Sequence, residues 1–160
     1  MTKLKLITLL TSLASIAMMI FQSCEKEENE HGCGATNISA NNQNESHNMG
    51  QNCMNCHKDG GEGKGCFYVA GTVYDSLQSS TKANGIIKLY SGPNGTGILK
   101  GTIAVDAKGN FFTTDIIDFS SQVYPSITNT IGNVKYMGSG ISTGQCNSCH
   151  GISTDKIWTN

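Results

Sequence analysis

The same five-residue pattern occurs twice in this chain, once before the middle and once near the C-terminus. Cys53-Met54-Asn55-Cys56-His57 and Cys146-Asn147-Ser148-Cys149-His150 both have the form C-x-x-C-H. In this pattern two thiols bond the vinyl groups of one porphyrin, and the adjacent histidine binds the iron from the proximal side. The repeat therefore predicts two covalently attached haem c groups. The thioether residues would be Cys53, Cys56, Cys146 and Cys149, and the proximal iron ligands would be His57 and His150.

Two other uses of paired cysteines fit the sequence less well. Four cysteines could bind one zinc ion, but paired C-x-x-C zinc modules usually separate their pairs by about 15–20 residues. Here the whole of 57–145 separates them, and both motif histidines would be left without a role. A thioredoxin-like redox pair would need a βαβ pattern around the motif, and neither motif has one.

A sixth iron ligand has one candidate upstream of the first motif. Outside the two motifs the chain has only His31 and His47. The segment 47–53 resembles the stretch before the haem motif in some multihaem cytochromes, where an upstream histidine supplies the sixth ligand. This resemblance implies His47 as a ligand, and the alternative is a solvated histidine in a polar loop.

Another candidate sixth ligand lies before the second motif. Met137 is nine positions before Cys146, at the end of an expected strand. Thioether ligation would raise the potential of that haem above that of a bis-histidine haem. Ordinary packing of the methionine is the alternative. Met49 and Met54 are further thioethers, and Met54 lies inside the first haem loop.

The N-terminus has the features of an export signal. Two lysines precede the apolar run 6–21, which is shorter than the roughly 20 residues that a transmembrane helix needs. The run ends at Ser23-Cys24, which resembles the cleavage site of bacterial lipoproteins, and 25–28 resembles the acidic segment of Bacteroidota-type surface lipoproteins. The resemblance implies lipidation of Cys24 and an outer-membrane lipoprotein of the cell envelope, facing the periplasm or the cell surface. A soluble periplasmic protein with a plain secretory signal is the alternative.

Two of the seven cysteines remain when the haem motifs and Cys24 are set aside. They are Cys33 and Cys66. An exported chain meets an oxidising compartment, so a disulfide between them is the simplest expectation. Two free thiols are the alternative.

The charge composition argues against nucleic-acid partners. The 11 basic residues are all lysines, and they are balanced by 12 acidic residues. Proteins that recognise phosphate commonly use the planar guanidinium group of arginine, and this chain has no arginine.

Alternation of apolar and polar residues begins at Phe67 and predicts half-buried strands. The expected ranges are 67–74, 87–90, 99–106 and 110–114, with weaker candidates at 123–124 and 134–137. A tight turn at 106–109 is expected to join its flanking strands as a β-hairpin. The pattern predicts a mainly β chain, an antiparallel β-sandwich of six or seven strands.

The expected organisation has five segments. They are a lipoprotein signal peptide (1–23), a flexible tether (24–50), a first haem-binding segment (51–66), the β-sandwich (67–140) and a second haem-binding segment (141–160). The tether is expected because 25–50 is poor in large apolar residues. An even number of strands would bring the two haem motifs to the same end of the sandwich, whereas an odd number favours opposite ends.

Two family resemblances follow from these motifs. The segment 67–137 resembles the transthyretin-like, carboxypeptidase-regulatory type of β-sandwich, through 70–75, 87–90 and 106–111. The repeated C-x-x-C-H resembles class c cytochromes. Together they imply a membrane-anchored dihaem cytochrome that transfers electrons to and from redox partner proteins of the cell envelope.

Two other functions are open at the level of sequence. A lipid-anchored β-sandwich could bind protein or glycan, with haem or metal in a structural role. A haem enzyme would need an open iron position beside an acid–base group. The nearest carboxylate pair, Asp115 and Asp118, follows a strand as a solvated turn would, so we expect an electron carrier rather than an enzyme.

Overall fold

The computed structural model describes residues 33–160, so the expected signal peptide and Cys24 lie outside the described residues. Within 33–160 the chain forms eight strands and three short 3₁₀ helices, with no α-helix, and no helix there could cross a membrane. The strands are β1 Val69–Tyr74, β2 Ile86–Tyr90, β3 Leu99–Ala104, β4 Asn110–Thr113, β5 Tyr124–Thr128, β6 Val134–Tyr136, β7 Gly144–Gln145 and β8 Ile157–Trp158. The 3₁₀ helices are η1 Cys53–Asn55, η2 Pro93–Gly95 and η3 Cys146–Ser148.

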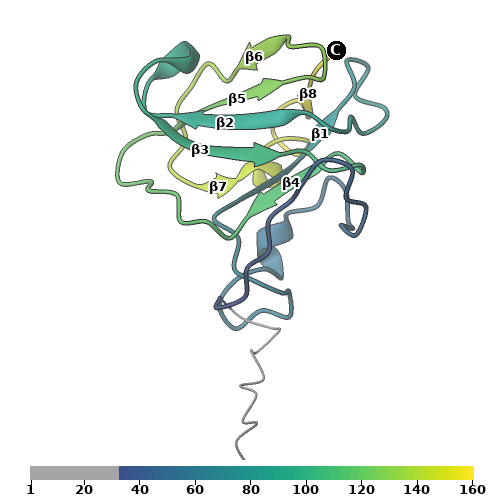
Figure 1. Ribbon diagram of the computed structural model, residues 1–160, viewed down its shortest axis with the longest axis vertical. Coiled ribbons are helices and arrows are strands. Elements are labelled where there is room, and N and C mark those ends of the chain that lie inside the picture. The colour runs from purple at the N-terminus through teal and green to yellow at the C-terminus, as the bar shows by residue number, and fades with distance from the viewer. Residues whose placement is uncertain (1–32) are drawn as a thin grey trace, which may run out of the picture.

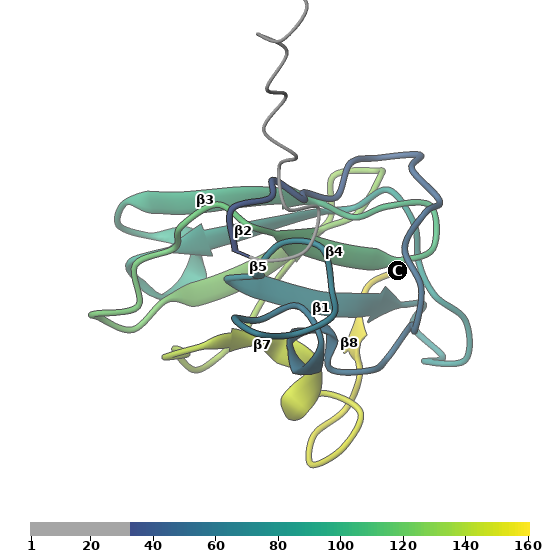
Figure 2. The ribbon, with the colours of Figure 1, turned by 90° about the horizontal axis from the view of Figure 1, so that it is seen from below.

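The strands form two sheets that lie one over the other (Figure 1). One sheet has the order β4-β1-β7, with β8 also paired to β1, and the other has the order β3-β2-β5-β6. Figure 2 shows the two layers from another side, with β2 and β3 in one and β1 and β8 in the other. The predicted mainly β fold is confirmed.

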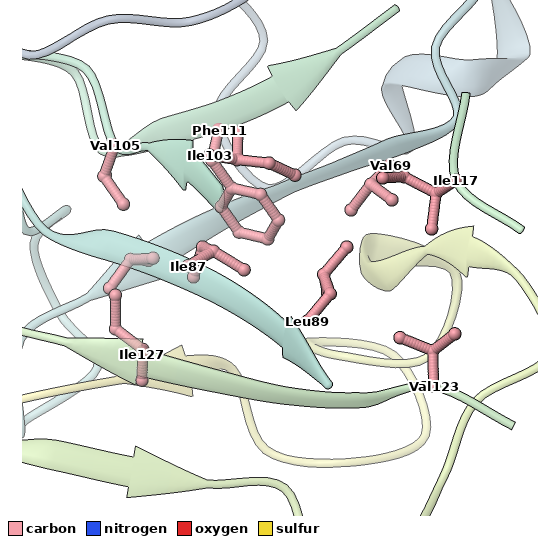
Figure 3. Close-up of a cluster of buried hydrophobic side chains, with 10 residues drawn as sticks. Val69, Ile87, Leu89, Ile103, Val105, Phe111, Ile117, Val123 and Ile127 are labelled. Carbon is pink, nitrogen blue, oxygen red and sulfur yellow. The ribbon is translucent and has the colours of Figure 1, made fainter. Parts of the chain in front are cut away.

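Apolar side chains from both sheets fill the space between the layers (Figure 3). Phe111 of β4 and Leu89 of β2 are each about 1% exposed. Full burial of such a side chain contributes roughly 1.5–3 kcal/mol. The buried cluster consists of Val69, Val73, Ile87, Leu89, Ile103, Val105, Phe111, Ile117, Val123 and Ile127.

The number and direction of the strands differ from the prediction. The described residues contain eight strands rather than six or seven, because β7 and β8 have two residues each and are too short to show alternation. Both pair with β1 in parallel, so the first sheet is not purely antiparallel. The other pairs, including β1 with β4, are antiparallel.

Strand β1 was expected to be half-buried, but all six of its residues are buried. One face of β1 packs in the apolar core through Val69 and Val73. Its other face, which carries Thr72, is covered by chain that contains the two cysteine motifs. The alternation in the sequence therefore predicted the position of the strand correctly. It did not predict that other parts of the chain bury the outer face of the strand.

The predicted β-hairpin at 106–109 is wrong, although a tight turn is present there. The amide of Gly109 donates to the carbonyl of Asp106, and the Asp106 carboxylate accepts from the amides of Lys108 and Asn110. However, β3 pairs with β2 and β4 pairs with β1. The turn thus carries the chain from one sheet to the other, and local turn chemistry alone does not distinguish these outcomes.

Residues 33–50, expected as part of a tether, lie along the sandwich. Ser39 is 3% exposed, and its hydroxyl donates to the carbonyl of Ala104 over 2.6 Å. The Nδ2 of Asn41 donates to the carbonyl of Val105 over 3.0 Å. Hydrogen bonds to backbone groups in and beside the sheets hold this polar segment, which is why its composition did not reveal it.

Candidate functional site

The two C-x-x-C-H motifs have the same backbone conformation. In each, a 3₁₀ helix begins at the first cysteine, and the carbonyl of that cysteine accepts from both the second cysteine and the histidine. The distances are 3.2 Å and 3.0 Å for Cys53, and again 3.2 Å and 3.0 Å for Cys146. This shared conformation places each histidine in an equivalent position beside its cysteine pair.

Both motif histidines are oriented by a backbone carbonyl. The Nδ1 of His57 lies 2.9 Å from the carbonyl oxygen of Lys64, and the Nδ1 of His150 lies 2.6 Å from that of Asp155. A carbonyl only accepts hydrogen bonds, so Nδ1 carries the proton in each ring. The lone pair is then on Nε2. A hydrogen bond of this kind fixes the tautomer and orientation of metal-binding histidines.

The His57 ring is also positioned by packing. It stacks on Phe67, with ring centres 4.0 Å apart and an interplanar angle of 8°. Phe67 in turn stacks on Phe112 of β4, at 4.8 Å. Gly63 lies so close to the ring that an added Cβ would be 2.6 Å from its Cγ. A glycine at 63 therefore allows the exit loop to close over the histidine.

A cavity of about 810 Å³ adjoins the first motif. Its lining includes Cys53, Cys56, His57 and the exposed His47. The rings of His47 and His57 have centres 6.2 Å apart and an interplanar angle of 32°. Metal–imidazole bonds are about 2.0–2.1 Å long, so two histidines on opposite sides of one ion have ring centres on the order of 6 Å apart. The structure thus brings together the motif and the sixth ligand predicted beside it.

A second cavity, of about 650 Å³, adjoins the second motif. Its lining includes Cys146, Cys149 and His150, together with the half-buried Met137. The amide of Met137 donates to the carbonyl of Pro125 over 2.9 Å, which fixes this part of the chain beyond β6. The candidate thioether ligand and the candidate proximal histidine therefore border one cavity.

The rest of this second cavity is mainly apolar. Leu89 and Phe111 of the core form part of its wall, so the cavity extends toward the space between the sheets. Trp158 of β8 also borders it, with the Lys135 ammonium against the indole ring. Apolar walls with a few polar groups are typical of cofactor sites.

The two motifs lie side by side, although seven strands separate them in sequence. The Nδ2 of Asn52 donates to Oε1 of Gln145 over 3.0 Å, and both motifs contact β1. In Figure 2 the short turns of both motifs lie below β1. The seven strands between the motifs are an odd number, yet the motifs do not lie at opposite ends, because β7 is only two residues long and pairs with Val69 and Ala70 at the start of β1.

The close approach of the two motifs to β1 also buries the first cysteine of each motif and raises the pKa of its thiol. An added Cβ on Gly71 would lie 3.0 Å from the Cβ of Cys146, so the glycine leaves room for the second motif. Burial of its thiol raises the pKa of Cys146 to about 12, although the residue as a whole is half-buried, and the nearby Cys53 adds to this shift. Burial also raises the pKa of Cys53. The second cysteine of each motif is exposed.

In protein prepared without haem, we expect Cys146 to be alkylated far more slowly than Cys149. The thiolate is the reactive form, and a pKa of about 12 leaves a thiolate fraction on the order of 10⁻⁴ at pH 8. The rate at Cys146 should be lower by roughly 10²-fold or more, and should rise as the pH is raised toward the pKa. A time course of iodoacetamide labelling followed by peptide mass spectrometry measures both rates. Equal rates at the two cysteines would contradict the burial of this thiol.

The two remaining cysteines of the described part, Cys33 and Cys66, form a disulfide, with Cα atoms 4.5 Å apart. It closes a loop that contains the whole first motif and joins 33–50 to the start of the first sheet.

Within residues 33–160 no group of three or more His, Cys, Asp or Glu side chains is arranged to hold a metal ion.

Several residues of the site were not found from the sequence. Phe67 and Lys64 position His57, and Asp155 positions His150. Asn147, inside the second motif, is 2% exposed and contacts both β1 and the carbonyl of Gln51, two positions before the first motif. The variable positions of C-x-x-C-H carry no signal for such contacts, since the partners are distant in sequence.

Comparison with known proteins gives no relative. No protein-family model, no curated protein and no solved structure matches this chain.

Proposed function

We propose that this protein is an electron carrier with two covalently attached haem c groups, anchored to the membrane of the cell envelope through lipid on Cys24. Cys53 and Cys56 would hold one haem, and Cys146 and Cys149 the other. Bound haem supplies one-electron redox chemistry at its iron, while the protein sets ligands, burial and spacing.

One observation carries this proposal. In both motifs the histidine after the cysteine pair has Nδ1 bound to a backbone carbonyl, which leaves Nε2 as the ligating atom beside a cavity. The two motifs are far apart in the chain and have different exit loops, yet they share this arrangement.

The cavities support different sixth ligands for the two sites. His47 borders the first cavity, and its ring separation from His57 suits the binding of one ion by both histidines. Met137 borders the second cavity with His150. We therefore assign a bis-histidine first haem and a histidine–methionine second haem. The second would have the higher potential, because methionine ligation raises it.

The expected cellular setting follows from the sequence. The apolar leader and Ser23-Cys24 favour an outer-membrane lipoprotein, and the partners would be other redox proteins of the envelope. The transthyretin-like resemblance of 67–137 would make the sandwich a rigid support for the two motifs.

The direct test is to express the chain with haem-c maturation, purify it and quantify haem by pyridine haemochrome. We expect two haems per chain, covalently retained on a denaturing gel and reversibly reduced by dithionite. A matured sample without covalent haem would overturn the proposal and favour a lipid-anchored β-sandwich that binds protein or glycan.

A further inference from the structure

Side-chain amides tie the two motifs to each other. Asn52, directly before the first motif, donates from Nδ2 to Oε1 of Gln145, directly before the second, over 3.0 Å. Asn147, inside the second motif, donates from Nδ2 to the carbonyl of Gln51 over 2.9 Å. Both bonds join segments more than ninety positions apart in the chain. The Asn52 side chain also caps η1, since its Oδ1 accepts from the amide of Met54 over 3.2 Å, whereas its bond to Gln145 reaches outside the first motif.

The same contact is anchored to β1 by a buried polar network. The Oδ1 of Asn147 accepts from the amide of Thr72 over 3.2 Å, and its Nδ2 donates to the Thr72 hydroxyl oxygen over 3.0 Å. The Thr72 hydroxyl donates to Oδ1 of Asn110 over 2.7 Å. These three residues are 0–2% exposed. Buried polar networks with every partner in place are rigid, because any displacement leaves unpaired groups.

The network continues to the segment that carries the candidate sixth ligand of the first site. The Nδ2 of Asn110 donates to the hydroxyl of Ser46 and to the backbone carbonyl of His47, at 2.9 Å and 3.2 Å. The amide of Gly50 donates to the hydroxyl oxygen of Thr72 at 2.9 Å. The chain on both sides of His47 is thus bound to the support that holds the second motif.

We propose that Asn52, Gln145 and Asn147 form an interlock that holds the two haem-binding motifs at one fixed separation and orientation. They are positioning residues, since none is a thioether residue or an iron ligand. This consequence rests on the proposed function. An electron that passes from one iron to the other oxidises the first and reduces the second. It would cross a constant distance within the chain, and no bond forms or breaks and no proton moves.

The interlock can be tested without haem. Replacing Cys24, Cys53 and Cys146 with serine, while Cys33 and Cys66 stay in their disulfide, leaves the exposed Cys56 and Cys149 for nitroxide labels, one in each motif. Pulsed electron paramagnetic resonance should give one narrow distance distribution. Adding Gln145→Ala should broaden it, because this half-buried side chain provides the acceptor for Asn52 without capping η3. An equally narrow distribution in Gln145→Ala and in Asn147→Ala would overturn the proposal.

A second test uses the loaded protein. Two haems held close at a fixed angle should give a two-signed couplet in the Soret circular dichroism. Gln145→Ala should keep two haems per chain but lose most of the couplet, whereas Gln145→Glu should keep it because a carboxylate oxygen can accept from Asn52. Gln122→Ala is the matched control, since Gln122 only accepts from the Tyr124 hydroxyl on the surface. An unchanged couplet in Gln145→Ala would contradict the interlock.

The two tests separate the interlock from the proposed function. If the matured chain holds no haem, the electron-carrier proposal fails, and the spin-label distances still decide the interlock. If two haems are present without a couplet in the unmodified protein, the interlock fails and the electron-carrier proposal stands.

Discussion

Replacing Cys53 and Cys56 together with alanine is expected to remove one of the two haems and leave the other in place. Replacing Cys146 and Cys149 should remove the second haem and leave the first. Thioether bonds are the covalent link in each motif, and the cavities have separate linings, so each pair should act on its own haem. Pyridine haemochrome and intact mass should both fall from two haems per chain to one.

The disulfide pair gives a matched control for this experiment. Replacing Cys33 and Cys66 with serine removes the same number of cysteines but should leave two haems per chain. This double serine variant should lose about 2–4 kcal/mol of the free energy of unfolding, which thermal or denaturant unfolding would measure. If a motif pair could be removed with both haems retained, the assignment of cysteines to haem would be wrong.

The core strands could be predicted because their pattern is local. Ile87 and Leu89 alternate with polar neighbours in β2, and the structure buries both side chains between the sheets. Alternation sets which side of a strand faces the core, whatever its partners are. The paired thiols and histidines were likewise predicted as site residues from spacing alone, since the motif is contiguous in sequence.

What the sequence did not reveal depends on contacts between distant segments. The pairing of β7 with β1 joins Gly144 to Val69, and no alternation marks a strand of two residues. The cover over Thr72 comes from Gly50, just before the first motif, and from Asn147, inside the second, and these lie on either side of the sandwich in sequence. The change of sheet after Asp106 likewise depends on which partner each strand finds. Each of these features results from tertiary packing, which a local pattern does not encode.

Replacing the candidate sixth ligands should change the two haems in different ways. In Met137→Ala the potential of one haem should fall, because methionine ligation raises it and axial ligands set haem potentials over about 0.8 V. The near-infrared charge-transfer band of methionine-ligated ferric haem should disappear as well. In His47→Ala the other haem should lose its strong sixth ligand and change from low to high spin. Redox titration followed optically, with electron paramagnetic resonance, measures both effects.

The control for these two variants is Met49→Ala. Met49 is a methionine like Met137, and it lies two positions from His47, so it matches one replaced residue in type and the other in position. Its side chain is 45% exposed. It should leave both potentials and both spin states unchanged, because it is absent from the lining of either cavity. A shift in Met49→Ala with none in Met137→Ala would move the thioether ligand to residue 49. Unchanged spectra in His47→Ala would show that the first iron takes its sixth ligand from elsewhere, even though the two imidazole rings lie 6.2 Å apart.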